Sequence, residues 1–386
     1  MSHVESAKEI DIVEEGPSFY SNDSSYWSPW KTADALLERL GDGGDLEPYQ
    51  EVTRQVCHIL RKWGDDWAGE LKSFLRKTSA LLHETEESIV ALHHLREWWL
   101  SFQGDFIAVD LCSGKGYFSM YLKYLADLYW NQDDSYQLKK IILMDKDTTI
   151  HWDHLTTANS AGGVRLELWP GSNLHETEQL LVALEGRNIP LALTGIHLCR
   201  MLSPSFLSLV NSLKQRCAYM CLAPCCLPRC VSKNSTKSLR ISIHRSADTI
   251  RKENKLRPCY LCQEQTHLVR DCPLLPENPK EKSRLCQEAA KSVPCWNCGK
   301  LGHFRRDCTF NAANKLSKMI RLDTSSVMES ANPFASYCQV LAEQGLSAKR
   351  AVTKLVDTGF KNSINLKDHE DNWNSIRKSV YIVAYD

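Results

Sequence analysis

Cysteine and histidine recur at metal-ligand spacing in two short segments of the chain. Each segment has the form Cys-x2-Cys-x4-His-x4-Cys. The eight residues are Cys259, Cys262, His267 and Cys272, followed by Cys295, Cys298, His303 and Cys308. Three thiolates and one imidazole complete a tetrahedral Zn2+ shell and leave no open position for catalysis. Segments this small have almost no core, so bound metal must supply their folding energy, on the order of 10 kcal/mol per site. The pattern predicts two structural zinc ions.

A second constellation joins an acidic residue to a glycine turn. Phe106 to Val109 is apolar enough for a buried strand, Asp110 ends it, and Cys112-Ser113-Gly114-Lys115-Gly116 leads into an apolar helix. Glycines in such a turn let the backbone approach a nucleotide-like ligand beside helix N-terminal amides. The turn does not match a Walker loop, because Val109 stands where that loop needs its first glycine. It does not match a dinucleotide fingerprint either, because Ser119 takes the third glycine's place. A purely structural glycine turn remains open.

Another carboxylate ends the next strand. Lys140 to Asp147 reads as a buried strand that carries Asp145 near its end. In a doubly wound sheet this end lies beside the glycine turn, where Asp145 could accept hydrogen bonds from both ribose hydroxyls of a nucleoside. We therefore hypothesise that the turn binds S-adenosylmethionine.

The run Asp-Leu-Cys-Ser-Gly-Lys-Gly-Tyr-Phe-Ser from Asp110 resembles the class I methyltransferase family. It is most similar to a branch that includes methyltransferase-like proteins and the eukaryotic tRNA 2′-O-methyltransferases with zinc fingers. The resemblance implies an α/β fold with a Rossmann-like sheet of seven strands, the last one antiparallel. It implies cofactor contacts at Asp110, Cys112, Gly114, Gly116 and Asp145. It also implies that the end of the third strand faces the adenine, which makes Ser172 and Asn173 cofactor candidates. Cys112 stands where the family more often has glycine.

Candidate catalytic residues follow the next two strands. Pro190 to Leu198 and Cys217 to Ala223 read as strands whose ends carry His197 and the pair Cys225-Cys226. Both ends should border the transferred methyl group, because ligands sit at the carboxyl ends of such strands. Three roles are open for the two cysteines: lining of a substrate pocket, ligands of an extra metal with His197 or Cys230, or a thiolate nucleophile. The Asn/Asp-Pro-Pro-Tyr/Phe motif typical of amino-group methylation is absent.

The two cysteine and histidine segments resemble retroviral and cellular zinc knuckles. Knuckles bind single-stranded nucleic acid by stacking bases on aromatic side chains while basic residues follow the backbone. The matching residues are Tyr260, Trp296, Phe304, Arg305 and Arg306. From Arg229 to Arg321 there are 20 Lys or Arg against 8 Asp or Glu, an excess that suits a polyanion. RNA is therefore the expected partner, and the resemblance makes tRNA the first candidate. Docking of a protein on the knuckles is the alternative.

Composition places the protein among intracellular ones. Sixteen cysteines would suit a disulfide framework in a short secreted chain, but the first ten residues contain no apolar signal core. No apolar run approaches the roughly 20 residues of a membrane span. We therefore expect a protein of the cytoplasm or nucleus, not secreted and not in a membrane, with reduced thiols available to metal. The oligomeric state is open.

The predicted organisation has five parts. Residues 1–30 form a flexible N-terminus, 31–100 a helical cap, 101–230 the methyltransferase core, 231–320 a basic insert with knuckles at 259–272 and 295–308, and 321–386 the rest of the methyltransferase domain. Tryptophans 63, 67, 98 and 99 in the cap are read as core, with base stacking as the alternative. Helices are expected at Thr148–Asn159, Pro333–Gln344 and Ser347–Gly359. Val380–Tyr385 should be the final strand, with Ser363–Leu366 as its hairpin partner.

Taken together, the patterns predict a methyltransferase that uses S-adenosylmethionine and acts on RNA delivered by its zinc knuckles. A non-catalytic RNA-binding protein on a methyltransferase-like scaffold and a protein methyltransferase are the two alternatives.

Overall fold

The structure is a computed structural model of the 386-residue chain. The structure describes residues 29–67, 75, 79–131, 137–176, 180–181, 183–184, 189–233, 237–243, 261–262, 264, 272–276, 278–292, 318–347, 350–358 and 380–386. Among the helices in these ranges, none combines the length and the apolar character needed to cross a membrane.

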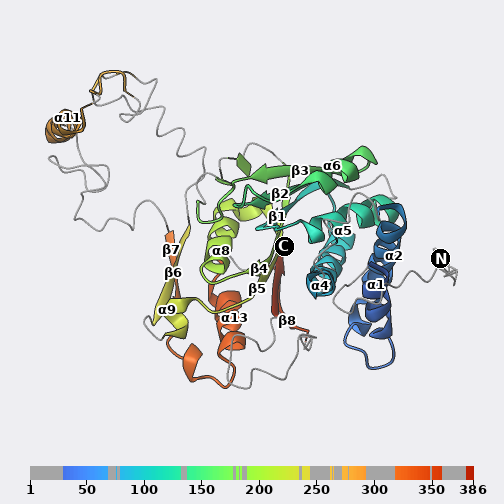
Figure 1. Ribbon diagram of the computed structural model, residues 1–386. Coiled ribbons are helices and arrows are strands. Elements are labelled where there is room, and N and C mark those ends of the chain that lie inside the picture. Colours follow the sequence, from blue (N-terminus) through green and yellow to red (C-terminus); the bar gives the residue numbers. More distant parts are fainter. Residues whose placement is uncertain are drawn as a thin grey trace.

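A mostly parallel sheet of seven strands forms the centre of the molecule (Figure 1). Its strands are β1 (Phe106–Leu111), β2 (Leu138–Asp145), β3 (Arg165–Pro170), β4 (Leu191–Leu198), β5 (Cys217–Pro224), β8 (Val352–Asp357) and β9 (Val380–Tyr385). They lie in the order β3-β2-β1-β4-β5-β9-β8, and only the pairs made by β9 are antiparallel. The strand order reverses between β1 and β4, which is where such sheets bind ligands. The predicted Rossmann-like fold of seven strands is confirmed.

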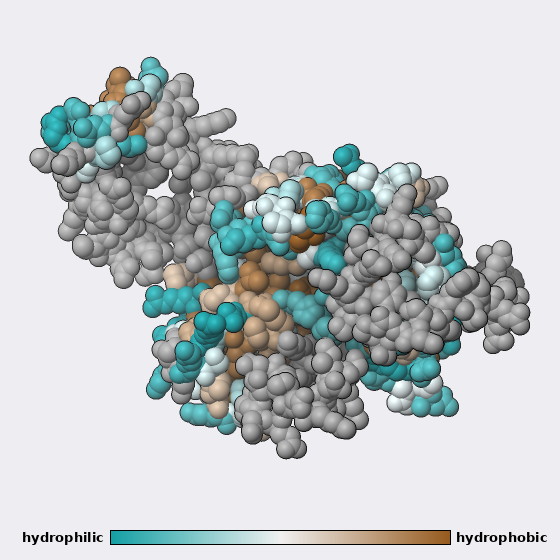
Figure 2. All heavy atoms as spheres, viewed as in Figure 1, coloured by the Kyte–Doolittle hydropathy of each residue, from teal (hydrophilic) through white to brown (hydrophobic). Residues whose placement is uncertain are grey.

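Helices cover both faces of this sheet, as a run of buried apolar strands requires. Phe106 and Ala108 of β1 pack into one core with α4 (Ser79–Ser101) and α5 (Tyr117–Leu125). Ile107 and Val109 point the opposite way, into a second core with α8 (Leu202–Leu213) and α13 (Pro333–Gln344). Figure 2 shows apolar residues near the middle of the view, where Figure 1 draws α8, with hydrophilic residues around them.

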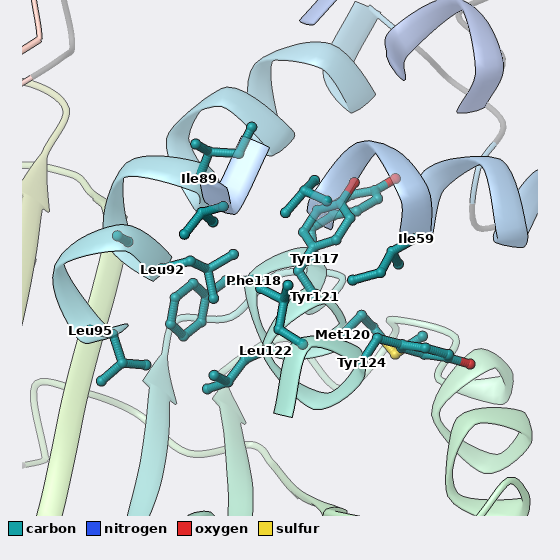
Figure 3. Close-up of a cluster of buried hydrophobic side chains, with 14 of the residues drawn as sticks. Ile59, Ile89, Leu92, Leu95, Tyr117, Phe118, Met120, Tyr121, Leu122 and Tyr124 are labelled. Atoms are coloured by element: carbon teal, nitrogen blue, oxygen red, sulfur yellow. The ribbon is translucent and has the colours of Figure 1, made fainter. Parts of the chain in front are cut away.

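The N-terminal helices α1 (Pro29–Glu38), α2 (Gln50–Trp67) and α4 belong to the first core. Figure 3 shows how side chains of α2, α4 and α5 interdigitate there. Trp63 is fully buried and stacks on Tyr121 with ring centroids 4.8 Å apart. Trp98 and Trp99 are buried as well, so these three tryptophans pack the core rather than stack on bases. The side chain of Trp67 lies outside the described residues.

The C-terminal part corrects two predictions. The helix expected at Ser347–Gly359 is wrong, because Val352–Asp357 is β8. The side chains of β8 alternate between half-buried and exposed, as in an edge strand, and its β-branched residues favour that state. β8 is also the hairpin partner of β9, in place of the expected Ser363–Leu366, which lies outside the described residues. The final strand Val380–Tyr385 and the helix Pro333–Gln344 lie where they were expected.

The helix after β2 is shorter than expected, because α6 spans Asp153–Ser160 rather than beginning at Thr148. Asp147 explains the late start: its carboxylate accepts hydrogen bonds from the backbone N–H and the hydroxyl of Thr149 at 2.8 and 2.7 Å. Such a local turn competes with the first turn of a helix.

A separate antiparallel pair, β6 (Ser238–Ile243) and β7 (Lys318–Asp323), follows the short helix α9 (Arg229–Ser232). Leu239, Ile241 and Leu322 anchor this pair in the second core. Ile243 is paired with Lys318, so the chain leaves and re-enters the domain at one place. The knuckle sequences fall between those two residues, as does α11 (Pro279–Ser292).

Candidate active site

Three residues with left-handed backbone shape the loop between β1 and α5. Cys112, Gly114 and Gly116 have φ values of 59°, 54° and 79°. A Cβ added at Gly114 would meet no atom within 4 Å, so open space lies beside this residue. The backbone N–H of Ser113 donates to the carbonyl of Met144 at 3.1 Å and holds the loop against β2. The loop is thus an open cradle that fits the close approach of a nucleoside cofactor.

Gly116 is required by packing as well as by backbone conformation, because a Cβ there would lie 2.6 Å from Cδ2 of Leu143. We expect Gly116→Ala to lower the free energy of unfolding by about 2 kcal/mol, through left-handed strain and displacement of Leu143. Gly114→Ala is the matched control, since it adds the strain without the contact and should cost about 1 kcal/mol. Urea denaturation measures both, and equal losses would contradict the packing argument.

Asp145, at the end of β2, faces this loop. Its Oδ2 accepts the backbone N–H of Gly114 at 2.9 Å, and its Oδ1 accepts the N–H of Asp147 at 2.8 Å. Leu111 is aligned with Met144, so the ends of β1 and β2 are neighbours. A carboxylate has about four lone-pair sites, and this one is only half-buried, so it can accept further donors such as ribose hydroxyls.

Asp110 lies in a different environment, although it ends the neighbouring strand. Its side chain is buried, and Oδ2 accepts a hydrogen bond from the Ser119 hydroxyl at 2.7 Å. Burial raises the pKa of Asp110 to about 7, and the nearby charges of Asp145 and Glu84 act in the same direction. The carboxyl group therefore ties α5 to β1 beneath the loop. A direct contact of Asp110 with the cofactor stays a prediction.

The loop after β3 joins the same region. The backbone N–H of Ser172 donates to the carbonyl of Asp145 at 3.0 Å, which sets this loop beside the end of β2. The side chain of Asn173 is used within its own turn, where it accepts from the N–H of His175 and donates to Glu176, both at 3.1 Å. The predicted contact of Asn173 with adenine stays a prediction.

The ends of β4 and β5 bring His197 and three cysteines to the same edge. His197 has a left-handed backbone with φ of 59°, and its Nε2 contacts the Glu87 carboxylate. Cys199 and Cys225 form a disulfide with Cα atoms 5.3 Å apart, and Sγ of Cys226 lies 3.8 Å from Sγ of Cys225. A disulfide-bonded Cys225 is neither a thiolate nucleophile nor a metal ligand, which corrects two of the three roles open for it and the expectation of reduced thiols. Sequence reasoning named Cys225 and Cys226 but left Cys199 out of the candidate residues.

Helix α4 adds residues that sequence reasoning missed. His83, Glu84 and Glu87 lie on its second and third turns, where Glu87 is buried and Glu84 is half-buried. Burial is the main cause that raises the pKa of Glu84, while the charges of His197 and Lys115 lower it. The contact of Glu87 with His197 and the hydrogen bond between Thr85 and Tyr121 put the start of α4 against the end of β4 and against α5. Three acids beside a histidine, in the run from His83 to Glu87, were the available signal.

Most of the predicted zinc and RNA residues lie outside the described residues. Of the first pattern, Cys262 is half-buried and Cys272 is buried. The predicted residues that lie outside the described ranges are Cys259, His267, Cys295, Cys298, His303, Cys308, Tyr260, Trp296, Phe304, Arg305 and Arg306. The two zinc sites and their RNA platforms therefore stay predictions from the sequence.

Two models of known protein families match the chain, and one of them covers the site described above. A methyltransferase domain model matches residues 81–230, a range that begins within α4, ends within α9 and contains the residues of the site. A zinc knuckle model matches residues 293–309, which is the second of the two patterns. The first pattern, at 259–272, falls outside that match. A search of curated proteins gives no match.

Proposed function

Because the chain carries a class I methyltransferase domain and a zinc knuckle, we propose that it transfers a methyl group from S-adenosylmethionine to RNA, with tRNA as the first expected substrate. The observation that carries the proposal is the pairing of Asp145 with the N–H of Gly114, next to open space at the loop. A carboxylate at the end of one strand and a glycine cradle at the end of its neighbour suit a ribose and its attached groups.

S-adenosylmethionine, when bound, supplies a methyl group activated by its sulfonium. The protein's own contribution is to hold donor and acceptor in line, which can account for most of the acceleration of a methyl transfer. Asp145 and the loop would fix the cofactor through its ribose. His197, Cys225 and Cys226 would line the acceptor side, at the ends of the two strands beyond β1. The zinc knuckles would bring RNA to that side by stacking and charge.

Transfer of labelled methyl groups tests the proposal. The full-length protein, loaded with zinc, is incubated with labelled S-adenosylmethionine and either total RNA or total protein, and labelled RNA is then analysed by nucleoside mass spectrometry. We expect label in RNA at one kind of nucleoside, and far less label with an Asp145→Ala variant at the same cofactor concentration. Label in protein alone would favour a protein methyltransferase. Cofactor-independent RNA binding with no transfer to either pool would favour a non-catalytic scaffold.

The knuckle platform gives a separate prediction. Trp296→Ala should weaken binding of single-stranded RNA roughly tenfold, because stacking of one base on an aromatic ring contributes about 1–3 kcal/mol. Trp296→Phe keeps a ring at the same position and should retain most of the affinity. Fluorescence anisotropy with a labelled oligonucleotide measures both variants at one salt concentration. Unchanged affinity of Trp296→Ala would remove Trp296 from the RNA interface.

A further inference from the structure

Two histidines and one buried carboxylate converge beside the glycine loop. His83 and Glu87 are one turn apart on α4, and Nε2 of His83 lies 3.2 Å from Oε1 of Glu87. His197, from the end of β4, brings its Nε2 against Oε2 of the same carboxylate, and its ring centroid lies 5.2 Å from that of His83. One nitrogen or oxygen from each residue lies within 4.8 Å of the others. These distances suit ligands of a single ion.

The carboxylate of Glu87 is buried between the two histidines. Its side chain is 5% exposed, and Oε2 has the Nε2 of His197 as its contact. A buried carboxylate is unfavourable unless a cation compensates it, and an ion held by the three side chains would do so. His197 is in addition held in a left-handed backbone conformation, the kind of local strain that collects at functional sites.

The donor set points to one class of ion. Two imidazoles and a carboxylate suit divalent first-row transition metals, whereas sites made of thiolates select zinc or copper(I). Three protein ligands also leave coordination positions open, as in catalytic sites and unlike the closed Cys3His knuckle. We propose that His83, Glu87 and His197 bind a divalent transition-metal ion with open positions toward the acceptor side of the site.

Other clusters in the described part of the chain fit this role less well. Glu97, beside His93 and His94, is more exposed and already has the ammonium of Lys354 at 3.4 Å. Cys199 and Cys225 are joined to each other. His83 and Glu87 lie next to α5, the helix that follows the glycine loop, because Thr85 between them shares a hydrogen bond of 2.8 Å with the hydroxyl of Tyr121. The ion would therefore sit next to the cofactor cradle.

The role of the ion in catalysis rests on the proposed function, although its binding does not. An open position could hold a hydroxyl of the acceptor and lower its pKa, as metals do for bound water. The hydroxyl proton would pass to solvent, the oxygen would form its bond to the methyl carbon, and the bond from that carbon to sulfur would break to leave a neutral thioether. The acceptor atom would then be an oxygen, in agreement with the missing motif of amino-group methylation.

Mn2+ titration of the full-length protein, loaded with no more than two equivalents of zinc so that the thiolate-rich knuckles take the zinc, tests the site without any substrate. The paramagnetic resonance signal of free Mn2+ reports binding, and Mn2+ competes poorly for thiolate ligands. We expect one bound Mn2+ per chain, with affinity at least tenfold weaker in Glu87→Gln and in His197→Asn. His93→Gln, which alters the other histidine cluster of α4, should bind like the unchanged protein.

Each result decides the proposal. No bound Mn2+, equal binding by all variants, or loss in His93→Gln alone would overturn it. Near-ultraviolet circular dichroism checks that the variants are folded, and Glu87→Gln keeps the size of the side chain should His197→Asn fail that check. Failure of the proposed function would look different: Mn2+ would bind, while calorimetry would detect no S-adenosylmethionine binding and no methyl group would be transferred.

Discussion

Replacing Asp145 with alanine should weaken S-adenosylmethionine binding by about 100-fold or more. The carboxylate is the group at the end of β2 that can accept from both ribose hydroxyls, and each hydrogen bond to a charged acceptor contributes about 1.5–3 kcal/mol. It also fixes the loop through the N–H of Gly114 at 2.9 Å. The variant therefore loses both the hydrogen bonds to the ribose and the hydrogen bond that holds the glycine loop at Gly114. Isothermal titration calorimetry with the full-length protein measures the change.

Asp147→Ala is the matched control for that experiment. Asp147 is an exposed carboxylate two residues along the same turn, and its oxygen accepts hydrogen bonds from Thr149 rather than from the glycine loop. Its removal should change cofactor affinity by less than about twofold, because it lies outside the ribose contact. Equal losses in the two variants would mean that the effect is general to the turn. An unaltered affinity of Asp145→Ala would place the ribose elsewhere.

The buried carboxyl of Asp110 should make the protein less stable as the pH rises. Its pKa is about 7 in the folded protein against a usual 3.8, chiefly because of burial. Between these values the folded state holds a proton that the unfolded state has released, so stability falls with increasing pH. Asp110→Asn cannot ionise and should escape this loss. From pH 5 to pH 8 the variant should gain about 3 kcal/mol relative to the unchanged protein.

Urea denaturation of both proteins at several pH values tests the pH effect, since their difference cancels the titration of every other group. Ser119→Ala refines the test, because the Ser119 hydroxyl donates to Asp110 at 2.7 Å and lowers its pKa. Without this donor, the pH at which the loss of stability ends should move upward. A difference between Asp110→Asn and the unchanged protein that stays constant from pH 5 to pH 8 would rule out titration of Asp110 in this range.

The sequence predicts the first half of the sheet well because several local signals coincide there. Phe106 to Val109 is a buried apolar run, a carboxylate ends it, and glycines follow at once, so strand, turn and helix are all marked in one place. Leu138–Asp145 has the same character. The parallel pairing of these strands then follows from the alternation of strands and helices. Both acidic residues are consequently found at neighbouring strand ends.

Other features depend on contacts that no local pattern contains. β8 has alternating exposure and few strongly apolar residues, so its state is decided by pairing with β9. Glu87 meets His197 only because α4 packs across the end of β4, and these residues are far apart in the chain. Cys199 joins Cys225 because β4 pairs with β5, which aligns Leu198 with Pro224. Local spacing predicts the cofactor side of the site, whereas the acceptor side is assembled by tertiary packing.

The place of β9 in the sheet has a consequence for biosynthesis. β9 lies between β5 and β8, yet it begins at Val380, whereas β5 ends at Pro224. During synthesis on the ribosome, one edge of β5 stays unpaired until the whole knuckle segment has been made and β9 can pair with that edge. Exposed strand edges invite aggregation, and closing a long loop is slow. A nascent chain arrested before Val380 would therefore be a natural client for chaperones.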